Sequence, residues 1–396
     1  MLAWQAAVDW PHQQLERVPP SAFRPRFCPR AGCPQHLLDW PRRFRYTRCG
    51  FFTRKSDRRC FPRFRCLVCR SRFTQPAFTT SYYLKRPELL APVAAGLNAG
   101  SAHRQIARSL DCAPSTVTRL AARLGRHALL LQARALDRLP AIEEPIVLDH
   151  FETFVVRQEE ALALATPVGQ RSWFVYGVDP APHRRGGRRS GAQNKRLRER
   201  PVSRHAGSYR RSTERVLEML LAKLPEQRQL QLVSDGHPAY ARALQSHSKR
   251  GRIRHHIYSN PPRGPKGSKP SPSAVIRDRQ MRAVDALHGL LRHTCAHHRR
   301  ETIAFGRRTN AVTERGFLTL IWRNFVKKIT ERRRDRTTAA MGLGLTEAQW
   351  SWDRVLARRL FPGRTRLPRG WAKVYWRGWI TPSIGPNTVH QRRFAF

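Results

Sequence analysis

The stretch from Gln229 to Tyr240 constrains the fold of this chain more than any other part of the sequence. Leu230 to Val233 are aliphatic enough for a buried strand, and an apolar pattern at helical spacing begins after Pro238. Asp235 lies between the two. A carboxylate where a buried strand ends is held rigidly and still faces solvent, which suits metal binding better than packing. We therefore expect Asp235 to lie in a cleft, with a turn-forming role as the alternative.

Two other acids occupy comparable positions. The run from Pro145 to Asp149 is short and apolar, and it ends in a carboxylate. Glu314 lies in the segment Asn310 to Asn324, whose apolar residues recur at helical spacing. Two strand-borne aspartates and one helix-borne glutamate can converge on a single site, with a position on a solvated helix face as the alternative for Glu314.

The balance of charges indicates a polyanionic partner. The 396 residues, enough for two or three domains, include 75 Lys and Arg against 27 Asp and Glu, a formal net charge of +48. Such a chain repels itself unless a polyanion neutralises it, and nucleic acid is the natural candidate. An anionic membrane surface is the alternative, but the sequence has no apolar run near ~18 residues and no signal-peptide pattern at residues 1–20. We expect a cytoplasmic protein without a membrane partner.

Six cysteines within residues 28–69 indicate a metal site, because clustered cysteines in the cytosol bind metal more often than they form disulfides. Two close pairs can offer four thiolates in a tetrahedron, as structural Zn²⁺ requires. The paired residues are Cys28, Cys33, Cys66 and Cys69. Cys49 and Cys60 lie between the pairs and could replace a ligand, and six unrelated thiols are the alternative. Because protein fills all four positions, the expected role of the zinc is structural.

Residues 85–135 have a helical pattern. Ser101 has the side chain of an N-cap for one short helix, and Pro114 opens a second helix after a tight turn. Two short helices and a tight turn are typical of a DNA-binding helix-turn-helix, with an ordinary helical hairpin as the alternative. The outward residues of the second helix, which can reach base edges and phosphates, are Ser115, Thr116, Thr118, Arg119 and Arg123.

The remaining elements follow a recognisable order. We expect antiparallel strands at 146–156, 161–166 and 173–178, a helix at 213–224, the strand before Asp235, a helix, a strand at 252–258 and helices at 275–297 and 310–324. This is the order of a ribonuclease-H-like fold. The expected class is a multidomain α+β or α/β protein with a zinc ribbon, a helix-turn-helix and a mixed sheet flanked by helices.

Short motifs between Cys28 and Leu345 support a family resemblance. They are Leu148-Asp149, Ser234-Asp235-Gly236-His237, Asn310, Glu314-Arg315 and the run Trp322 to Lys327. In this order they resemble the DDE transposases of bacterial insertion sequences that place a zinc ribbon and a helix-turn-helix before the catalytic domain. The first cysteine pair is wider than the resemblance leads one to expect, and the intervals between the acids are long.

The resemblance implies Mg²⁺-dependent hydrolysis at the ends of an element, followed by joining of the released 3′-hydroxyl to target DNA. Two Mg²⁺ or Mn²⁺ ions ~3.5 to 4 Å apart would serve both steps. Asp149, Asp235 and Glu314 would bind these ions, and Arg315 or Arg323 would contact phosphate. The partners would be double-stranded element ends and target DNA in a bacterial nucleoid, held by a homodimer or a larger assembly.

The expected layout is an N-terminal arm (1–25), a zinc-ribbon-like domain (26–80), a helix-turn-helix domain (85–135), a catalytic domain (141–345) with a basic insert (183–211), and a basic Trp-rich tail (346–396). The rings of the tail can stack on bases or pack onto the catalytic domain. Two other functions are left open. One is a DNA-binding regulator in which the zinc ribbon and the helix-turn-helix act alone, and the other is a ribonuclease-H-like nuclease that cuts without joining.

Overall fold

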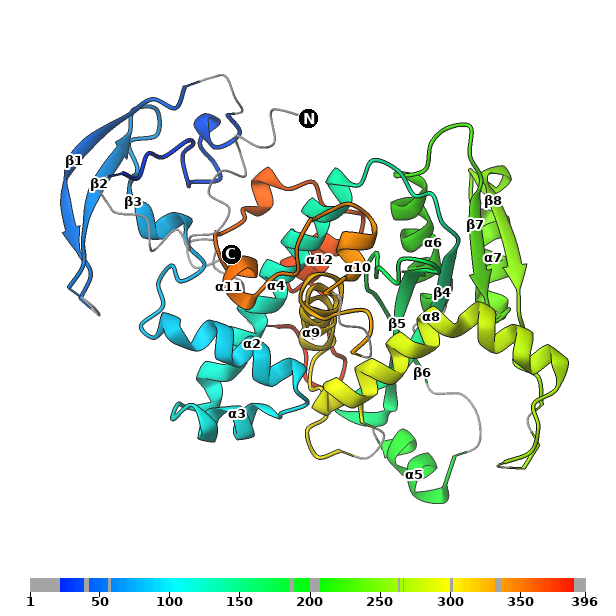
Figure 1. Cartoon of the computed structure of the whole chain (residues 1–396). Helices are drawn as coiled ribbons and strands as arrows, with labels where there is room; N and C mark the ends of the chain where they lie inside the picture. The colour runs from blue at the N-terminus through cyan, green and yellow to red at the C-terminus, as the bar shows by residue number, and fades with distance from the viewer. Residues whose placement is uncertain are drawn as a thin grey trace. The chain divides into compact units, whose positions relative to one another are not determined.

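The computed structural model describes residues 22–38, 43–55, 58–184, 189–199, 207–262, 264–265, 267–299, 302–331 and 336–387. Most of the expected N-terminal arm, parts of the basic insert and the end of the tail lie outside these residues. Among the described residues the chain folds into two compact units, one with residues 22–95 and 350–366, the other with residues 96–349 and 367–387 (Figure 1). These units differ from the expected layout, because the helix-turn-helix shares a unit with the strand-rich region and both units include part of the tail.

The first unit is built on a three-stranded antiparallel sheet in the order β1-β2-β3. Its strands are β1 (Tyr46–Thr53), β2 (Cys60–Cys66) and β3 (Arg72–Thr74), and its short helices are η1 (Pro34–His36), η2 (Gln75–Phe78), η3 (Pro87–Leu89), α11 (Trp352–Val355) and η7 (Pro362–Arg364). In β2, Phe64 and Cys66 are buried while Arg65 between them is partly exposed, the alternation of a strand with one covered face. Aromatic rings fill the core: Phe23, Phe44, Phe64, Phe73, Phe78 and Phe361.

The second unit contains a five-stranded mixed sheet in the order β6-β5-β4-β7-β8. Its strands are β4 (Ile146–Val155), β5 (Arg157–Gly169), β6 (Asp179–Arg184), β7 (Leu230–Ser234) and β8 (Ile253–Ile257). β4, β5 and β6 are antiparallel neighbours, β7 is parallel to β4, and β8 is parallel to β7. The strand expected at 173–178 is wrong, since the third strand is β6. Pro180 and Pro182 conceal it in the sequence, because proline is tolerated in a strand chiefly at a sheet edge, where β6 lies.

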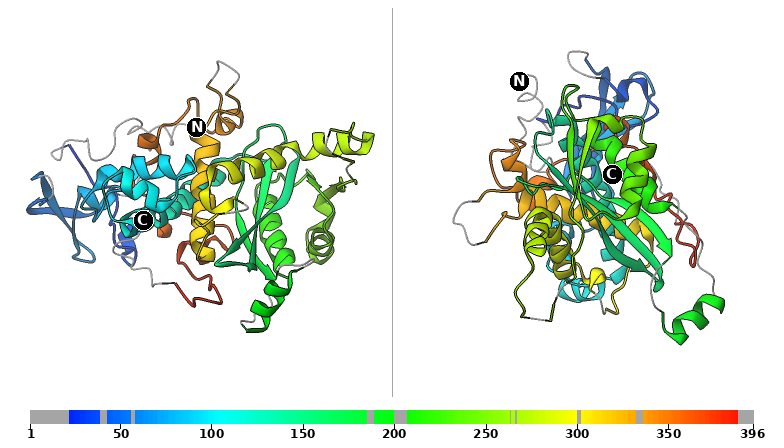
Figure 2. Two further views of the ribbon diagram at one scale, coloured as in Figure 1. Left: turned by 90° about the horizontal axis from the view of Figure 1, so that it is seen from below. Right: turned by 90° about the vertical axis from the view of Figure 1, so that its right-hand side faces the viewer.

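Helices cover both faces of this sheet (Figures 1 and 2). The helices of this unit are α2 (Leu90–Asn98, whose end lies in this unit), α3 (His103–Ser109), α4 (Pro114–Arg138), α5 (Gly191–Glu199), α6 (Ser208–Leu221), α7 (Pro238–Ser246), η4 (Arg250–Arg252), α8 (Pro272–Thr294), η5 (Ala296–His298), α9 (Thr309–Ile321), the π-helical η6 (Trp322–Val326), α10 (Ala339–Gly342) and α12 (Trp371–Tyr375). His150 and Phe151 are consecutive on β4 and so point to opposite faces. The His150 ring contacts Tyr209 of α6, and the Phe151 ring contacts His288 of α8. Thus α6 and α8 lie on opposite faces of the sheet.

α9 is the central helix of the second unit. Each of its residues except Ala311 is buried, as expected of a helix enclosed on all sides. α4 lies against α9, and the two helices approach closely at Gly125, where an added Cβ would be 2.6 Å from the Cβ of Glu314 (Figure 1). The helix that begins in the helix-turn-helix is therefore also part of the core.

The tail contributes to the core of each unit. In the first unit, the Phe361 ring lies 5.9 Å from the Phe78 ring, and the backbone N–H of Arg359 donates to the Phe78 carbonyl at 2.9 Å. In the second unit, Trp371 is buried with its ring 4.6 Å from the Phe317 ring. Of the two roles considered for the tail rings, packing is the one that Trp371 has in this structure.

Candidate functional site

Asp149 and Asp235 lie side by side where β7 ends. The parallel register pairs Val147 of β4 with Val233 of β7, so two residues further along Asp149 comes level with Asp235. Burial, and after it the negative charge of Asp235, raises the pKa of Asp149 to about 7. The Oδ1 atom of Asp235 accepts the backbone N–H of His237 at 3.1 Å. The structure therefore brings the two strand-borne aspartates together.

The two oxygens of the Asp149 carboxylate have different surroundings. Oδ1 accepts the backbone N–H of His150 at 2.7 Å and the hydroxyl of Tyr240 at 3.3 Å. Oδ2 lies 3.6 Å from Nδ1 of His288, which projects from α8. Burial, followed by the charges of nearby arginines, lowers the pKa of His288 to about 3, so this imidazole is neutral. Oδ1 is thus held by two donors, and Oδ2 is directed toward α8.

A third acid that influences Asp149 comes from α8 and was missed by sequence reasoning. Asp285 is close enough to Asp149 for its negative charge to contribute to the raised pKa of Asp149. The same carboxylate forms an ion pair with Arg277, one of its neighbours on α8. The sequence signal for Asp285 was a carboxylate within the helix expected at 275–297. Asp285 belongs to none of the motifs on which the family resemblance was based.

Glu314 does not join the two aspartates. Its carboxylate is 1% exposed and lies 3.4 Å from Nη1 of Arg126 on α4 and 3.3 Å from Nε of Arg377. Gly316, two residues further along α9, faces the sheet, because a Cβ there would lie 3.8 Å from Leu164 of β5. Residues two apart on an α-helix point in nearly opposite directions, so Glu314 points away from the sheet. This placement contradicts the expectation that Glu314 completes the metal site.

The basic residues expected to contact phosphate are also buried. Arg315 is 6% exposed, and its guanidinium donates to the Leu97 carbonyl at 2.7 Å. Arg323 is 5% exposed and lies 5.8 Å from the centre of the Trp173 ring. Both expectations are therefore wrong for this conformation, because α9 and η6 lie inside the unit instead of on its surface.

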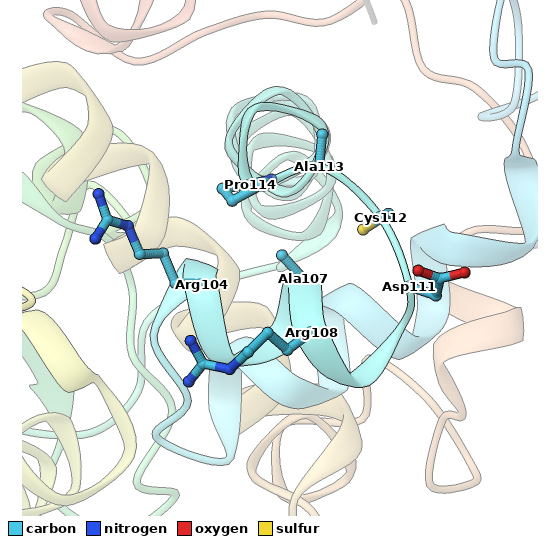
Figure 3. A pocket seen from close by; sticks show the side chains of 7 residues that line it. All are labelled: Arg104, Ala107, Arg108, Asp111, Cys112, Ala113 and Pro114. Atoms are coloured by element: carbon cyan, nitrogen blue, oxygen red, sulfur yellow. The ribbon is translucent and has the colours of Figure 1, made fainter.

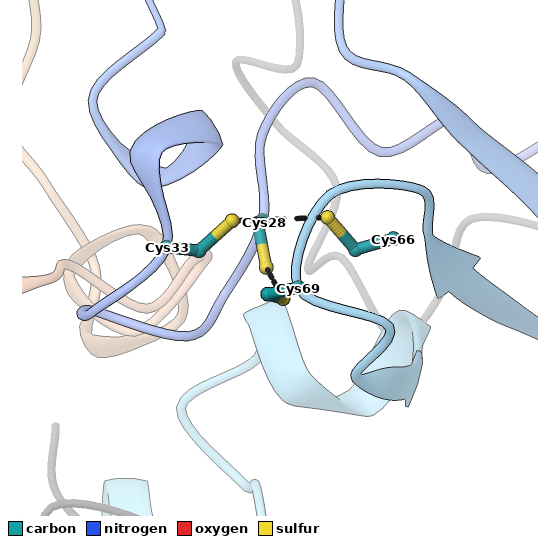
Figure 4. Close-up of side chains that lie close together, drawn as sticks. All are labelled: Cys28, Cys33, Cys66 and Cys69. Carbon is teal, nitrogen blue, oxygen red and sulfur yellow. Dashed lines mark hydrogen bonds between the residues drawn. The ribbon is translucent and has the colours of Figure 1, made fainter.

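Cys28, Cys33, Cys66 and Cys69 form a cluster that is positioned to bind a metal in the first unit (Figure 4). Their sulfur atoms all lie within 4.8 Å of one another, with 3.6 Å between Cys28 and Cys69 and 3.8 Å between Cys33 and Cys66. A tetrahedral zinc site with Zn–S bonds of about 2.3 Å has sulfur atoms about 3.8 Å apart. Burial raises the pKa of the Cys28 and Cys33 thiols, and a bound cation would reverse that effect.

The other two cysteines of this region lie elsewhere on the sheet. Cys49 belongs to β1, and Cys60 begins β2 opposite Thr53. Among the residues that the structure describes, only the four clustered cysteines bring three or more potential ligand atoms this close together. The four expected ligands are confirmed as a cluster positioned to bind a metal, and their geometry is compatible with structural zinc.

The helix-turn-helix region is formed by α3 and α4. Ser115, Thr118 and Arg119 are exposed at the start of α4, and Thr116 is half-buried. Arg123 is 6% exposed, so its expected outward position is wrong. The helix has entered the core by that point.

An open hollow of about 540 Å³ lies between α3 and the beginning of α4 (Figure 3). Arg104, Arg108 and Asp111 line it together with Cys112 and Pro114. Asp111 has a φ of 44°, in the left-handed region, at the turn between the helices. The hollow therefore belongs to the helix-turn-helix surface and is remote in sequence from the acids of β4 and β7.

Comparison with protein-family models and with curated proteins finds no match to this chain. Within the described residues, no helix is long and apolar enough to cross a membrane.

Proposed function

We propose that this chain is a divalent-metal-dependent DNA transposase with a ribonuclease-H-like core, in which Asp149, Asp235 and Asp285 bind the catalytic ions. The strand order supports such a core, since an antiparallel meander is followed by two strands parallel to its first strand. The observation that carries the proposal is the alignment of Asp149 and Asp235 on adjacent parallel strands, with Asp285 near enough to influence the same carboxylate.

The donor set fits divalent cations. Carboxylate oxygens are the ligands that Mg²⁺ prefers, and Mn²⁺ accepts them as well. Burial, and after it repulsion by the carboxylate of Asp235, raises the pKa of Asp149 to about 7. A cation between the carboxylates would remove this repulsion.

The chemistry requires ions and oriented ligands. Two bound ions would activate the oxygen nucleophile and neutralise charge on the leaving oxygen of a phosphodiester. The residues of the chain orient the ligands. Hydrogen bonds hold Oδ1 of Asp149 and Oδ1 of Asp235. Oδ2 of Asp149 is directed toward α8, and Oδ2 of Asp235 accepts a hydrogen bond from Nδ2 of Asn260 at 3.4 Å. Hydrolysis by water would release a 3′-hydroxyl, and attack by that hydroxyl on target DNA would join the ends.

DNA binding in this proposal rests on charge and on exposed residues of the helix-turn-helix. The net charge of +48 favours a polyanion. Ser115, Thr118 and Arg119 project from the exposed start of α4, where a recognition helix contacts base edges. A homodimer or larger assembly would bring two element ends together.

The second candidate is a DNA-binding protein without catalysis. It is favoured by one observation: the only close group of metal ligands among the described residues is the structural-type cysteine cluster. A nuclease that cuts without joining shares every feature of the acidic site and differs only in the fate of the cut end.

The proposal is tested by nicking of DNA that carries the repeats flanking the gene, in the presence of Mg²⁺. We expect Asp149→Asn, Asp235→Asn and Asp285→Asn each to abolish nicking. Asp278→Asn is the matched control, because Asp278 also lies on α8 and also pairs with Arg277, at 3.3 Å. It should keep wild-type activity.

Three outcomes separate the candidates. Equal nicking by the wild type and Asp235→Asn would remove the catalytic proposal. DNA binding without nicking by any variant would favour the regulator. Nicking without joining of the end to a second DNA would favour the nuclease.

A further inference from the structure

Tyr240 connects the helix that follows Asp235 to the carboxylate of Asp149. It lies on α7, five residues after Asp235, and its side chain is buried. Its hydroxyl donates to Oδ1 of Asp149 at 3.3 Å and lies 2.9 Å from Nδ1 of His150. The His150 ring is itself buried, 4.3 Å from the Tyr209 ring of α6. A chain of three polar groups therefore begins in the core and ends at the candidate metal site.

The direction of the hydrogen bonds follows from the chemistry of the groups. An ionised carboxylate can only accept, so the single proton of the Tyr240 hydroxyl goes to Asp149. Nδ1 of His150 must then carry a proton and donate it to the Tyr240 oxygen. Nε2 of His150 is left as an unprotonated nitrogen, and among the described residues this buried atom has no hydrogen-bond partner. An unprotonated nitrogen without a hydrogen-bond partner costs less folding free energy than a buried N–H group without an acceptor.

We propose that Tyr240, supported by His150, is a positioning residue that fixes the Asp149 carboxylate so that Oδ2 alone faces a divalent cation. The proposal rests on the proposed function, because it assumes that Asp149 is a metal ligand. Without the hydroxyl, Oδ1 keeps only the backbone N–H of His150 as a donor, and the carboxylate can rotate. Loss of such a supporting hydrogen bond weakens metal affinity roughly 10-fold or more.

The test is direct titration of Mn²⁺ into zinc-loaded full-length chain, followed by calorimetry, with Tyr240→Phe as the variant. Tyr176→Phe is a matched control, because Tyr176 is also fully buried and donates its hydroxyl to a buried carboxylate, Glu144, at 3.0 Å. Glu144 precedes β4, so this pair lies about 16 Å from Asp149 along the strand direction. We expect Tyr240→Phe to bind Mn²⁺ roughly 10-fold more weakly at unchanged stoichiometry, and Tyr176→Phe to bind as the wild type does.

Thermal unfolding checks that each variant is folded, and His150→Leu provides a second variant that removes the support of Tyr240 while the hydroxyl stays. We expect the same direction of change in affinity from it. Wild-type affinity in both Tyr240→Phe and His150→Leu would overturn the inference, as would an equal loss in Tyr176→Phe. If Asp235→Asn binds Mn²⁺ as the wild type does, the proposed metal site itself fails, and the role of Tyr240 fails with it.

Discussion

Replacing Glu314 with glutamine separates a structural role for this residue from a catalytic one. Its carboxylate is 1% exposed and has two guanidinium neighbours, Arg126 at 3.4 Å and Arg377 at 3.3 Å. Removing one partner of a buried ion pair costs roughly 3–5 kcal/mol, because the other charge stays buried without compensation. Two features reduce this loss: the side chain of Arg377 is 21% exposed, so solvent reaches its charge, and glutamine keeps one oxygen as an acceptor. We therefore expect Glu314→Gln to lose about 2–4 kcal/mol of unfolding free energy.

In a unit of this size, such a loss lowers the Tm by roughly 5–15 °C. Differential scanning calorimetry of the full chain measures it. Glu331→Gln is the control, because Glu331 pairs with Lys327 on the surface and its side chain is 69% exposed. Such a pair contributes less than about 1 kcal/mol.

Mn²⁺ titration of Glu314→Gln provides the second measurement. We expect wild-type affinity below the unfolding temperature, since Glu314 points away from the sheet. A variant with wild-type Tm that binds no Mn²⁺ and cuts no DNA would refute this reasoning and restore Glu314 as a metal ligand.

Three further predictions follow from other parts of the structure. Gly125→Ala should destabilise the chain by about 1–3 kcal/mol, because the new methyl would lie 2.5 Å from the Glu314 carbonyl oxygen, whereas Gly289→Ala in the exposed part of α8 meets no atom within 4 Å and should stabilise it slightly. Denaturant unfolding of both variants checks this, and equal effects would contradict the close approach of α4 and α9. Cys66→Ser should lose bound zinc and unfold the first unit, while Cys60→Ser should keep one zinc per chain; elemental analysis measures both. Zinc in neither variant, or in both variants, would rule out the four-cysteine site. The third prediction concerns pH, because burial lowers the pKa of His298 to about 3 in the folded chain. Between about pH 3 and 6.5 this histidine is protonated only in the unfolded chain, so the free energy of unfolding decreases as pH falls, by up to about 1.4 kcal/mol per pH unit. Thermal unfolding measured from neutral pH down to about pH 5 should show this decrease in stability, and the decrease should be smaller in His298→Gln. The same decrease in that variant would exclude His298 as its source.

Local patterns of residues were sufficient to predict several features of this protein. The spacing of Cys28, Cys33, Cys66 and Cys69 identified the cluster, because two short loops suffice to bring two pairs of thiols together. The aliphatic runs before Asp149 and Asp235 identified both carboxylates as strand-borne, since burial of a strand is visible as a run of apolar residues. Neighbouring parallel strands then place such residues at one edge.

Which polar residues face inward depends on packing between elements and could not be predicted from local patterns. Arg123, Arg315 and Glu314 have the side chains of a solvated helix face, yet packing inside the second unit buries all three. Asp285 comes near enough to influence the pKa of Asp149 because α8 packs against β4, a strand more than a hundred positions earlier in the chain. The tail is divided between two cores for the same reason. Helical and strand periodicities report which face of an element is apolar, but the partner that covers each face is set by packing between distant segments.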